Sequence, residues 1–264
     1  MQKKNVLVII LTALVFLSAA CLGVVSVYRV NFVTIHAPVI SEEAKEEVSL
    51  LQNKLFEAYE GENIFSTDDT IGKEIFEQFP YFKMTSFVKE YPNRIVIEAT
   101  EDIELFAVQK DENSYYILGA DGMVLSERNS SVNRSDNADN IVVTGVEISA
   151  KIGEIANNDE CLPWLYSFCD TTSRFLGGIR KNVTAIEVLR PTVVNAEMMF
   201  KIYFKEGVVA YVRKPSVYTQ DKARMLIEQY ENLSDSQRLR GMIVLSDNGE
   251  NAIVDYFQDE FSLA

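Results

Sequence analysis

The sequence is poor in the residues on which much enzyme and metal chemistry depends. Its 264 residues include one histidine, three cysteines and one tryptophan. With so few thiols and imidazoles, neither a structural zinc site nor a disulfide framework is expected. A catalytic triad could use only His36, and no G-x-S-x-G segment is present to provide a serine nucleophile. We therefore expect no catalytic, metal-binding or cofactor-binding site.

Positive charge is also scarce. The chain has 25 Lys and Arg against 39 Asp and Glu, a formal net charge of −14. A broad nucleic-acid-binding surface needs a basic face, so that class of function is not expected. Hydrophobic residues make up 47% of the chain, which indicates folded domains, and the length fits one or two of them.

One long apolar run stands at the N-terminus, from Val6 to Val27. As a helix its 22 residues would be about 33 Å long, enough to cross a hydrocarbon core of about 30 Å. Lys3 and Lys4 precede it, and the positive-inside rule places such an end in the cytoplasm. A cleaved signal peptide or a lipoprotein box ending at Cys21 fits less well, because the run continues beyond both sites. We therefore predict a short tail and an uncleaved transmembrane anchor over residues 1–30, with the rest of the chain outside the membrane.

Residues 31–100 show the pattern of a small β-α-α-β-β domain. Ser41 can cap a helix with one apolar stripe, and Gly61 ends it. A capping-box-like start at residues 66–69 predicts a second helix, which Pro80 ends. Strands are expected at residues 31–40, 83–90 and 94–100.

Residues 101–258 have mainly the pattern of short strands, with helices expected at residues 161–176 and 219–232. The predicted fold class is α+β: a transmembrane helix, the β-α-α-β-β domain, and a mostly antiparallel β domain. Residues 259–264 form a tail. Cys161 and Cys169 would stand about 12 Å apart on a helix, too far for a disulfide, so two unpaired buried thiols are favoured.

Several segments, in order along the chain, resemble the FtsQ/DivIB family of bacterial cell-division proteins. The similar segments are Gly61-Glu62-Asn63-Ile64-Phe65, Phe79-Pro80-Tyr81-Phe82, the hairpin from Phe87 to Ile97, Tyr115–Leu118 with Asp121–Val124, Ile141–Gly145, the helix that contains Lys222, Gly241–Leu245 and Ala252–Phe257. The chain departs from the family at Ile35–Ile40, where neither the usual Gly nor the usual Asn is present.

The resemblance implies a POTRA domain over residues 31–100 and the family's β domain over residues 101–258. It implies a non-catalytic bitopic scaffold in the bacterial cell membrane at the division septum, which binds FtsB/DivIC-like and FtsL-like proteins and helps control septal peptidoglycan synthesis. Two other functions remain open: an anchored extracellular enzyme such as a wall hydrolase, or a POTRA-bearing transport or assembly factor.

The last expected strand is the candidate binding site. It comprises Ala252, Ile253, Val254, Asp255, Tyr256 and Phe257. Edge strands are usually protected by Lys, Pro or a bulge, but residues 252–264 contain no Lys, Arg or Pro. The strand is therefore either an interior strand that ends the sheet or an edge at which a partner strand docks. The resemblance favours docking, because relatives receive the FtsB/DivIC subunit on their final strand.

Overall fold

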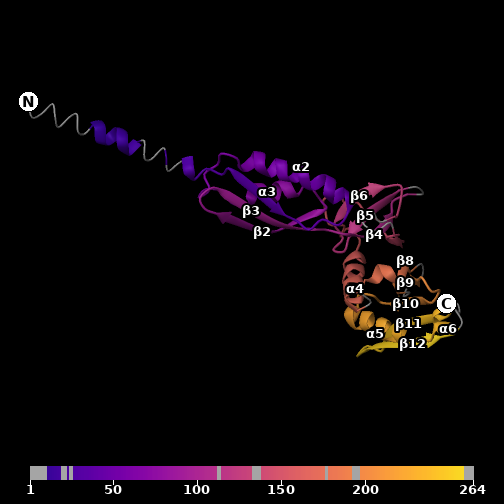
Figure 1. The fold of residues 1–264 in the computed structure, drawn as a ribbon. Helices are drawn as coiled ribbons and strands as arrows, with labels where there is room; N and C mark the ends of the chain where they lie inside the picture. The colour runs from indigo at the N-terminus through magenta and orange to yellow at the C-terminus, as the bar shows by residue number, and fades with distance from the viewer. Residues whose placement is uncertain are drawn as a thin grey trace, which may run out of the picture. The chain divides into compact units, whose positions relative to one another are not determined.

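The computed structural model describes residues 11–18, 23, 26–111, 114–132, 138–175, 178–191 and 197–258. The chain divides into two compact units, Met1–Glu101 and Asp102–Ala264. Most elements of both units are labelled in Figure 1. Sequence analysis places the domain boundary one residue earlier, between residues 100 and 101.

The expected membrane anchor is corrected by the structure. In the described part of the chain, no helix combines the length and the apolar character needed to cross a bilayer. The longest described helix, α2 (Glu42–Tyr59), has 18 residues, and seven of them are charged. Within Val6–Val27, the longest described helical stretch is residues 11–18, which rises only about 12 Å. The transmembrane helix in the predicted fold class, and the single-pass cell-membrane location built on it, are therefore not supported. Much of the expected span lies outside the described residues.

The first unit has the element order β-α-α-β-β. Its elements are β1 (Phe32–His36), α2, α3 (Thr70–Phe76), β2 (Phe82–Glu90) and β3 (Arg94–Glu101). The strands form one sheet in the order β1-β3-β2, in which β1 is parallel and β2 antiparallel to β3. The helix α2 begins where Ser41 Oγ accepts a hydrogen bond from the Ala44 amide at 3.2 Å, as the sequence predicts.

The second helix starts differently from the prediction. No capping box forms over residues 66–69: α3 begins only at Thr70, and Asp69 makes no side-chain cap bond. Instead, the Tyr59 hydroxyl donates to the Asp68 carbonyl and accepts from the Gly72 amide, both at 2.8 Å. A buried tyrosine from α2 thus contributes two of the polar contacts at the start of α3, beside the Asp68 carboxylate, which accepts from the Thr70 amide at 3.0 Å. The contribution of Tyr59 is not visible in a local motif.

The second unit contains one nine-stranded mixed sheet in the order β12-β11-β10-β9-β8-β7-β4-β5-β6. The strands are β4 (Glu104–Gln109), β5 (Tyr115–Gly119), β6 (Val124–Arg128), β7 (Ile141–Thr144), β8 (Val183–Leu189), β9 (Met199–Phe204), β10 (Val209–Arg213), β11 (Met242–Asp247) and β12 (Ala252–Phe257). Three neighbouring pairs, β4–β7, β7–β8 and β10–β11, are parallel, and the others are antiparallel. The helical segment between β10 and β11 makes the crossover that a parallel pair requires.

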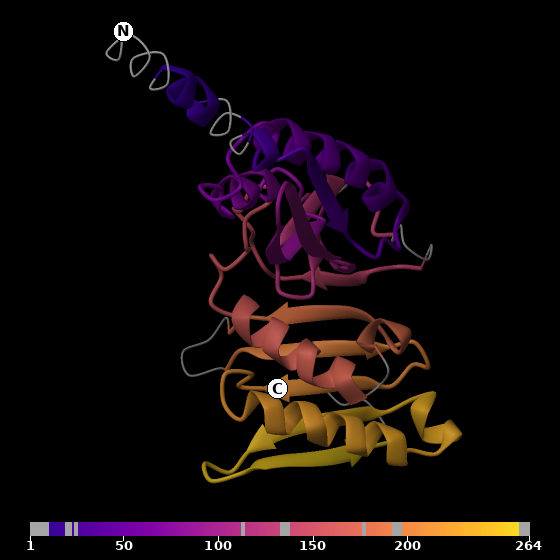
Figure 2. The same ribbon diagram turned by 60° about the vertical axis from the view of Figure 1, so that its left-hand side comes forward.

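Two helices, α4 (Leu162–Phe175) and α5 (Thr219–Asn232), lie side by side over one face of this sheet (Figure 2). Phe168 of α4 meets Phe200 edge-to-face at 6.5 Å, and Tyr230 of α5 stacks on Phe204 at 4.4 Å. Each such buried side chain contributes about 1.5–3 kcal/mol to stability through the area it removes from water. A short helix, α6 (Asp235–Arg238), and a 3₁₀ turn, η1 (Ile179–Lys181), complete the described helices of this unit.

Candidate partner-binding edge

Among the described strands of the second unit, β12 is the outermost at one side of the sheet, and its only strand neighbour is β11. Figure 2 shows it at the margin of the sheet, beyond β11. The six residues that the sequence singles out, Ala252 to Phe257, make up the whole strand. In the described sheet, β12 is therefore an edge strand.

The register of β12 shows which backbone groups point away from the sheet. Opposite residues of β11 and β12 pair as Asp247 with Ala252, and so on to Met242 with Phe257. In the turn that joins the strands, the Asn248 amide donates to the Asn251 carbonyl at 3.2 Å. Antiparallel pairs alternate between hydrogen-bonded and non-hydrogen-bonded positions along the ladder. It follows that the amide and carbonyl groups of Ala252, Val254 and Tyr256 point outward, where a docked strand could pair with them.

The side chains of β12 alternate between the two faces of the sheet. Val254 and Tyr256 pack against the core beneath the helices, whereas Phe257 packs on the opposite face with Met242 and its neighbours. Asp255 is exposed. The alternation therefore follows the sequence pattern, and the structure supplies what the pattern left open, namely which face is the core.

The hairpin that carries β12 is attached to the start of α5. Lys222 of α5 is 0% exposed. Its Nζ donates to the carbonyl oxygens of Arg213 and Lys214, at 2.7 and 3.0 Å, and lies 3.5 Å from Asp247 Oδ2 at the end of β11. Burial lowers the pKa of Lys222, while the Asp247 carboxylate opposes that shift. One buried ammonium group thus joins α5, the end of β10 and the end of β11.

The loop before α5 makes a second contact with the hairpin. Tyr218 Oη donates to the Gly249 carbonyl at 3.2 Å. Both Lys214 and Tyr218 have left-handed backbone conformations, with φ of 44° and 54°. Side chains other than glycine rarely adopt such angles, which persist only where the surroundings enforce them. The loop is therefore held in a defined shape against the turn that precedes β12.

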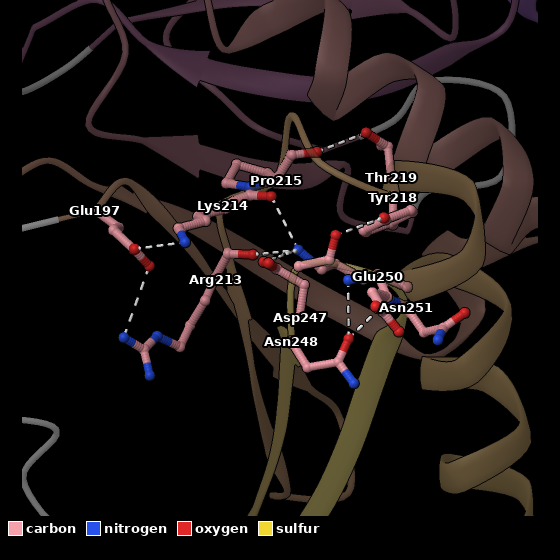
Figure 3. Close-up of polar contacts among 12 residues, drawn as sticks. Glu197, Arg213, Lys214, Pro215, Tyr218, Thr219, Asp247, Asn248, Glu250 and Asn251 are labelled. Atoms are coloured by element: carbon pink, nitrogen blue, oxygen red, sulfur yellow. Dashed lines mark hydrogen bonds and ion pairs between the residues drawn. The ribbon is translucent and has the colours of Figure 1, made fainter.

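Asn248 and Glu197 make further polar contacts around this hairpin, as Figure 3 shows. Asn248 Oδ1 accepts from the amides of Glu250 and Asn251, at 3.0 and 2.8 Å, so the side chain closes its own turn. Glu197 Oε1 lies 2.8 Å from Lys214 Nζ, and this hydrogen bond raises the pKa of Lys214.

The sequence gives only part of this arrangement. Lys222 lies four residues before Leu226 and eight before Tyr230, both on the apolar stripe of α5, so helical periodicity places it on the buried side. The left-handed Lys214 and Tyr218 have no comparable signal, because neither is a glycine or an asparagine.

Within the described ranges, no three potential ligands among His, Cys, Asp and Glu gather into a group that could hold a metal ion. His36, the one histidine, is exposed at the end of β1 opposite Glu98. Comparison of the sequence with protein-family models and with curated protein sequences finds no match.

Proposed function

We propose that the chain is a non-catalytic scaffold that receives an extended segment of a partner protein along β12. The observation that carries this proposal is the open edge: β12 has one strand neighbour in the described sheet and turns three residues' backbone groups outward. Docking by main-chain hydrogen bonds requires such an edge. The anchored hairpin supports it, because a strand held in place loses little freedom on binding.

The segments that resemble FtsQ/DivIB proteins suggest the setting. On that resemblance, the partners are FtsB/DivIC-like and FtsL-like division proteins, and the process is control of septal peptidoglycan synthesis in bacteria. Asp255, exposed in the middle of β12, favours a partner strand with a basic residue opposite it, since opposite charges across a strand pair stabilise the pair.

The test separates the backbone from the side chain at one position. Val254→Pro removes an outward amide without removing a hydrogen bond to β11, a position at which edge strands tolerate proline. Val254→Ala shortens the same side chain and keeps the amide. The affinity of the full chain for a purified FtsB/DivIC-like protein is measured by interferometry for both variants.

We expect Val254→Pro to weaken binding at least tenfold and Val254→Ala less than threefold. Fluorescence of Trp164, the only tryptophan, reports the fold of the second unit and serves as the control. Equal binding by the two variants, both folded, would exclude β12 as the docking strand.

A further inference from the structure

A pocket of about 340 Å³ opens beside the end of β12. Its lining residues come from α6, the segment after it, and β12: Ser236, Gln237, Leu239, Arg240, Tyr256 and Gln258. The Tyr256 hydroxyl is turned toward this segment and donates to the Arg240 carbonyl at 3.2 Å. The pocket thus adjoins the open edge.

The geometry of strand pairing places a partner residue at this pocket. Tyr256 turns its backbone groups outward, as derived from the ladder, and its side chain lines the pocket. On an added strand, the residue directly opposite Tyr256 must carry its side chain on the same face of the sheet. That side chain would lie over the pocket, whichever direction the added strand runs.

The lining favours an apolar side chain with a negative charge near it. Leu239 is 68% exposed and presents apolar surface at the rim of the pocket. Arg240 is exposed too, and no carboxylate in the described part of the chain pairs with its guanidinium. Arg238 differs, because it lies 3.9 Å from Glu206 and stacks over the Tyr230 ring. In a chain of net charge −14, Arg240 therefore presents a local positive charge at the end of the edge.

We propose that this pocket reads the sequence of the docked strand: it takes a large apolar side chain from the partner residue opposite Tyr256, and Arg240 binds a carboxylate beside that residue. The inference rests on the proposed function, since it assumes that β12 receives a strand. Main-chain pairing is the same for every sequence, so the pocket and Arg240 supply the discrimination that the backbone lacks.

Charge reversal at two arginines tests the carboxylate contact. Arg240→Glu should weaken binding of the full chain to the FtsB/DivIC-like protein at least tenfold. The matched control is Arg224→Glu, an exposed position on α5 outside the pocket, which should change binding less than twofold. Leu239→Ser should weaken binding as well, whereas Leu50→Ser, at another exposed leucine, on α2, should not.

A photo-cross-linking amino acid at position 239 identifies the partner residue. We expect the cross-link to fall on a large apolar residue with an acid within two positions, and exchange of that acid for Lys should restore binding to Arg240→Glu. A variant ending at Gln258 removes the chain's own Phe261 and Leu263 from the experiment and should bind as the full chain does.

The outcomes distinguish the two proposals. Loss of binding in Val254→Pro with undiminished binding in Arg240→Glu and Leu239→Ser would leave the docking edge standing and overturn the pocket. Cross-links to small or polar residues alone, or loss of binding on truncation after Gln258 with Arg240→Glu unaffected, would also overturn it. Undiminished binding in Val254→Pro would remove the docking edge itself.

Discussion

Lys222 Nζ lies 3.5 Å from Asp247 Oδ2, and this contact joins the helix over the sheet to the strand that carries the docking hairpin. The ammonium group is buried, and it also binds two backbone carbonyls at the end of β10. Removing one partner of such a buried pair leaves the others without their donor, which costs more than the pair itself contributes.

Lys222→Met should therefore lower the free energy of unfolding of the second unit by about 3 kcal/mol. Urea denaturation followed by Trp164 fluorescence measures it, because that residue lies in α4 of the same unit. Arg224→Met, two residues along α5 at an exposed position, should change stability by no more than about 0.5 kcal/mol. Equal free energies of unfolding for the two variants would show that the buried ammonium group does not stabilise the second unit.

How far the sequence predicts this fold depends on the range of each interaction. The N-terminal cap at Ser41 and the apolar faces of α2 and α5 follow from residues within a few positions of one another, and the structure has them. The order of the nine strands does not follow from any such pattern. In particular, β10 pairs in parallel with β11 across the whole of α5, and pairing over that distance leaves no local trace.

The candidate site, too, can be predicted from the sequence only in part. Missing Lys, Arg and Pro point to the last strand, and alternation assigns its two faces. The pocket at Leu239 and Arg240 arises because α6 and β12, about 20 residues apart, are brought together by the hairpin. The prediction of a transmembrane anchor was wrong for a related reason. A run of apolar residues shows only composition, and it does not establish that one continuous helix of spanning length forms.

Near the opposite edge of the same sheet, a buried ion pair joins β6 to β4. Arg128 Nη2 lies 2.6 Å from Glu104 Oε2, with the two side chains 8% and 4% exposed. The Asn140 side-chain Nδ2 donates to the same oxygen at 3.3 Å. Arg128→Met should destabilise the unit by about 3–4 kcal/mol, since it takes the Arg128 guanidinium away from a buried carboxylate.

The double variant Arg128→Met/Glu104→Gln provides the control for this pair. Removing the carboxylate charge as well should recover part of the lost stability, because the buried charge that Arg128 stabilises is then gone. Urea melts of the two single variants and the double variant give the coupling. Strict additivity of the two changes would show that the residues do not interact.

Gly145, directly after β7, occupies a position that only glycine can fill. Its φ is 77°, and a Cβ there would lie 2.2 Å from the Val188 carbonyl oxygen. Gly249 has a similar φ of 88° with no atom within 4 Å of the corresponding site. Gly145→Ala should therefore cost more than about 3 kcal/mol, and Gly249→Ala about 1 kcal/mol, the cost of the backbone conformation alone. Similar losses in both variants would contradict the close approach of β7 and β8 at this point.

Cys169 of α4 and Cys161, directly before α4, should be unreactive in the folded protein. Both are free and buried. Burial, with Asp159 nearby, raises the pKa of the Cys161 thiol to about 12, and burial also raises the pKa of Cys169. Only the thiolate reacts with disulfide reagents. At pH 8 the native Cys161 should thus react about a thousandfold more slowly than an ordinary thiol, while unfolding in urea should make both thiols reactive.

The same pKa shift of Cys161 makes stability depend on pH. Below about pH 9 the thiol is protonated in both the folded and the unfolded state, and above it only the unfolded chain ionises readily. Stability should therefore fall as the pH rises from about 9 toward 12. A Cys21→Ser chain leaves only these two thiols to titrate, with Cys161→Ala as the matched variant. Rapid labelling of Cys161 at pH 8 without urea, or an equal alkaline loss of stability in Cys161→Ala, would show that the thiol is not held protonated by the fold.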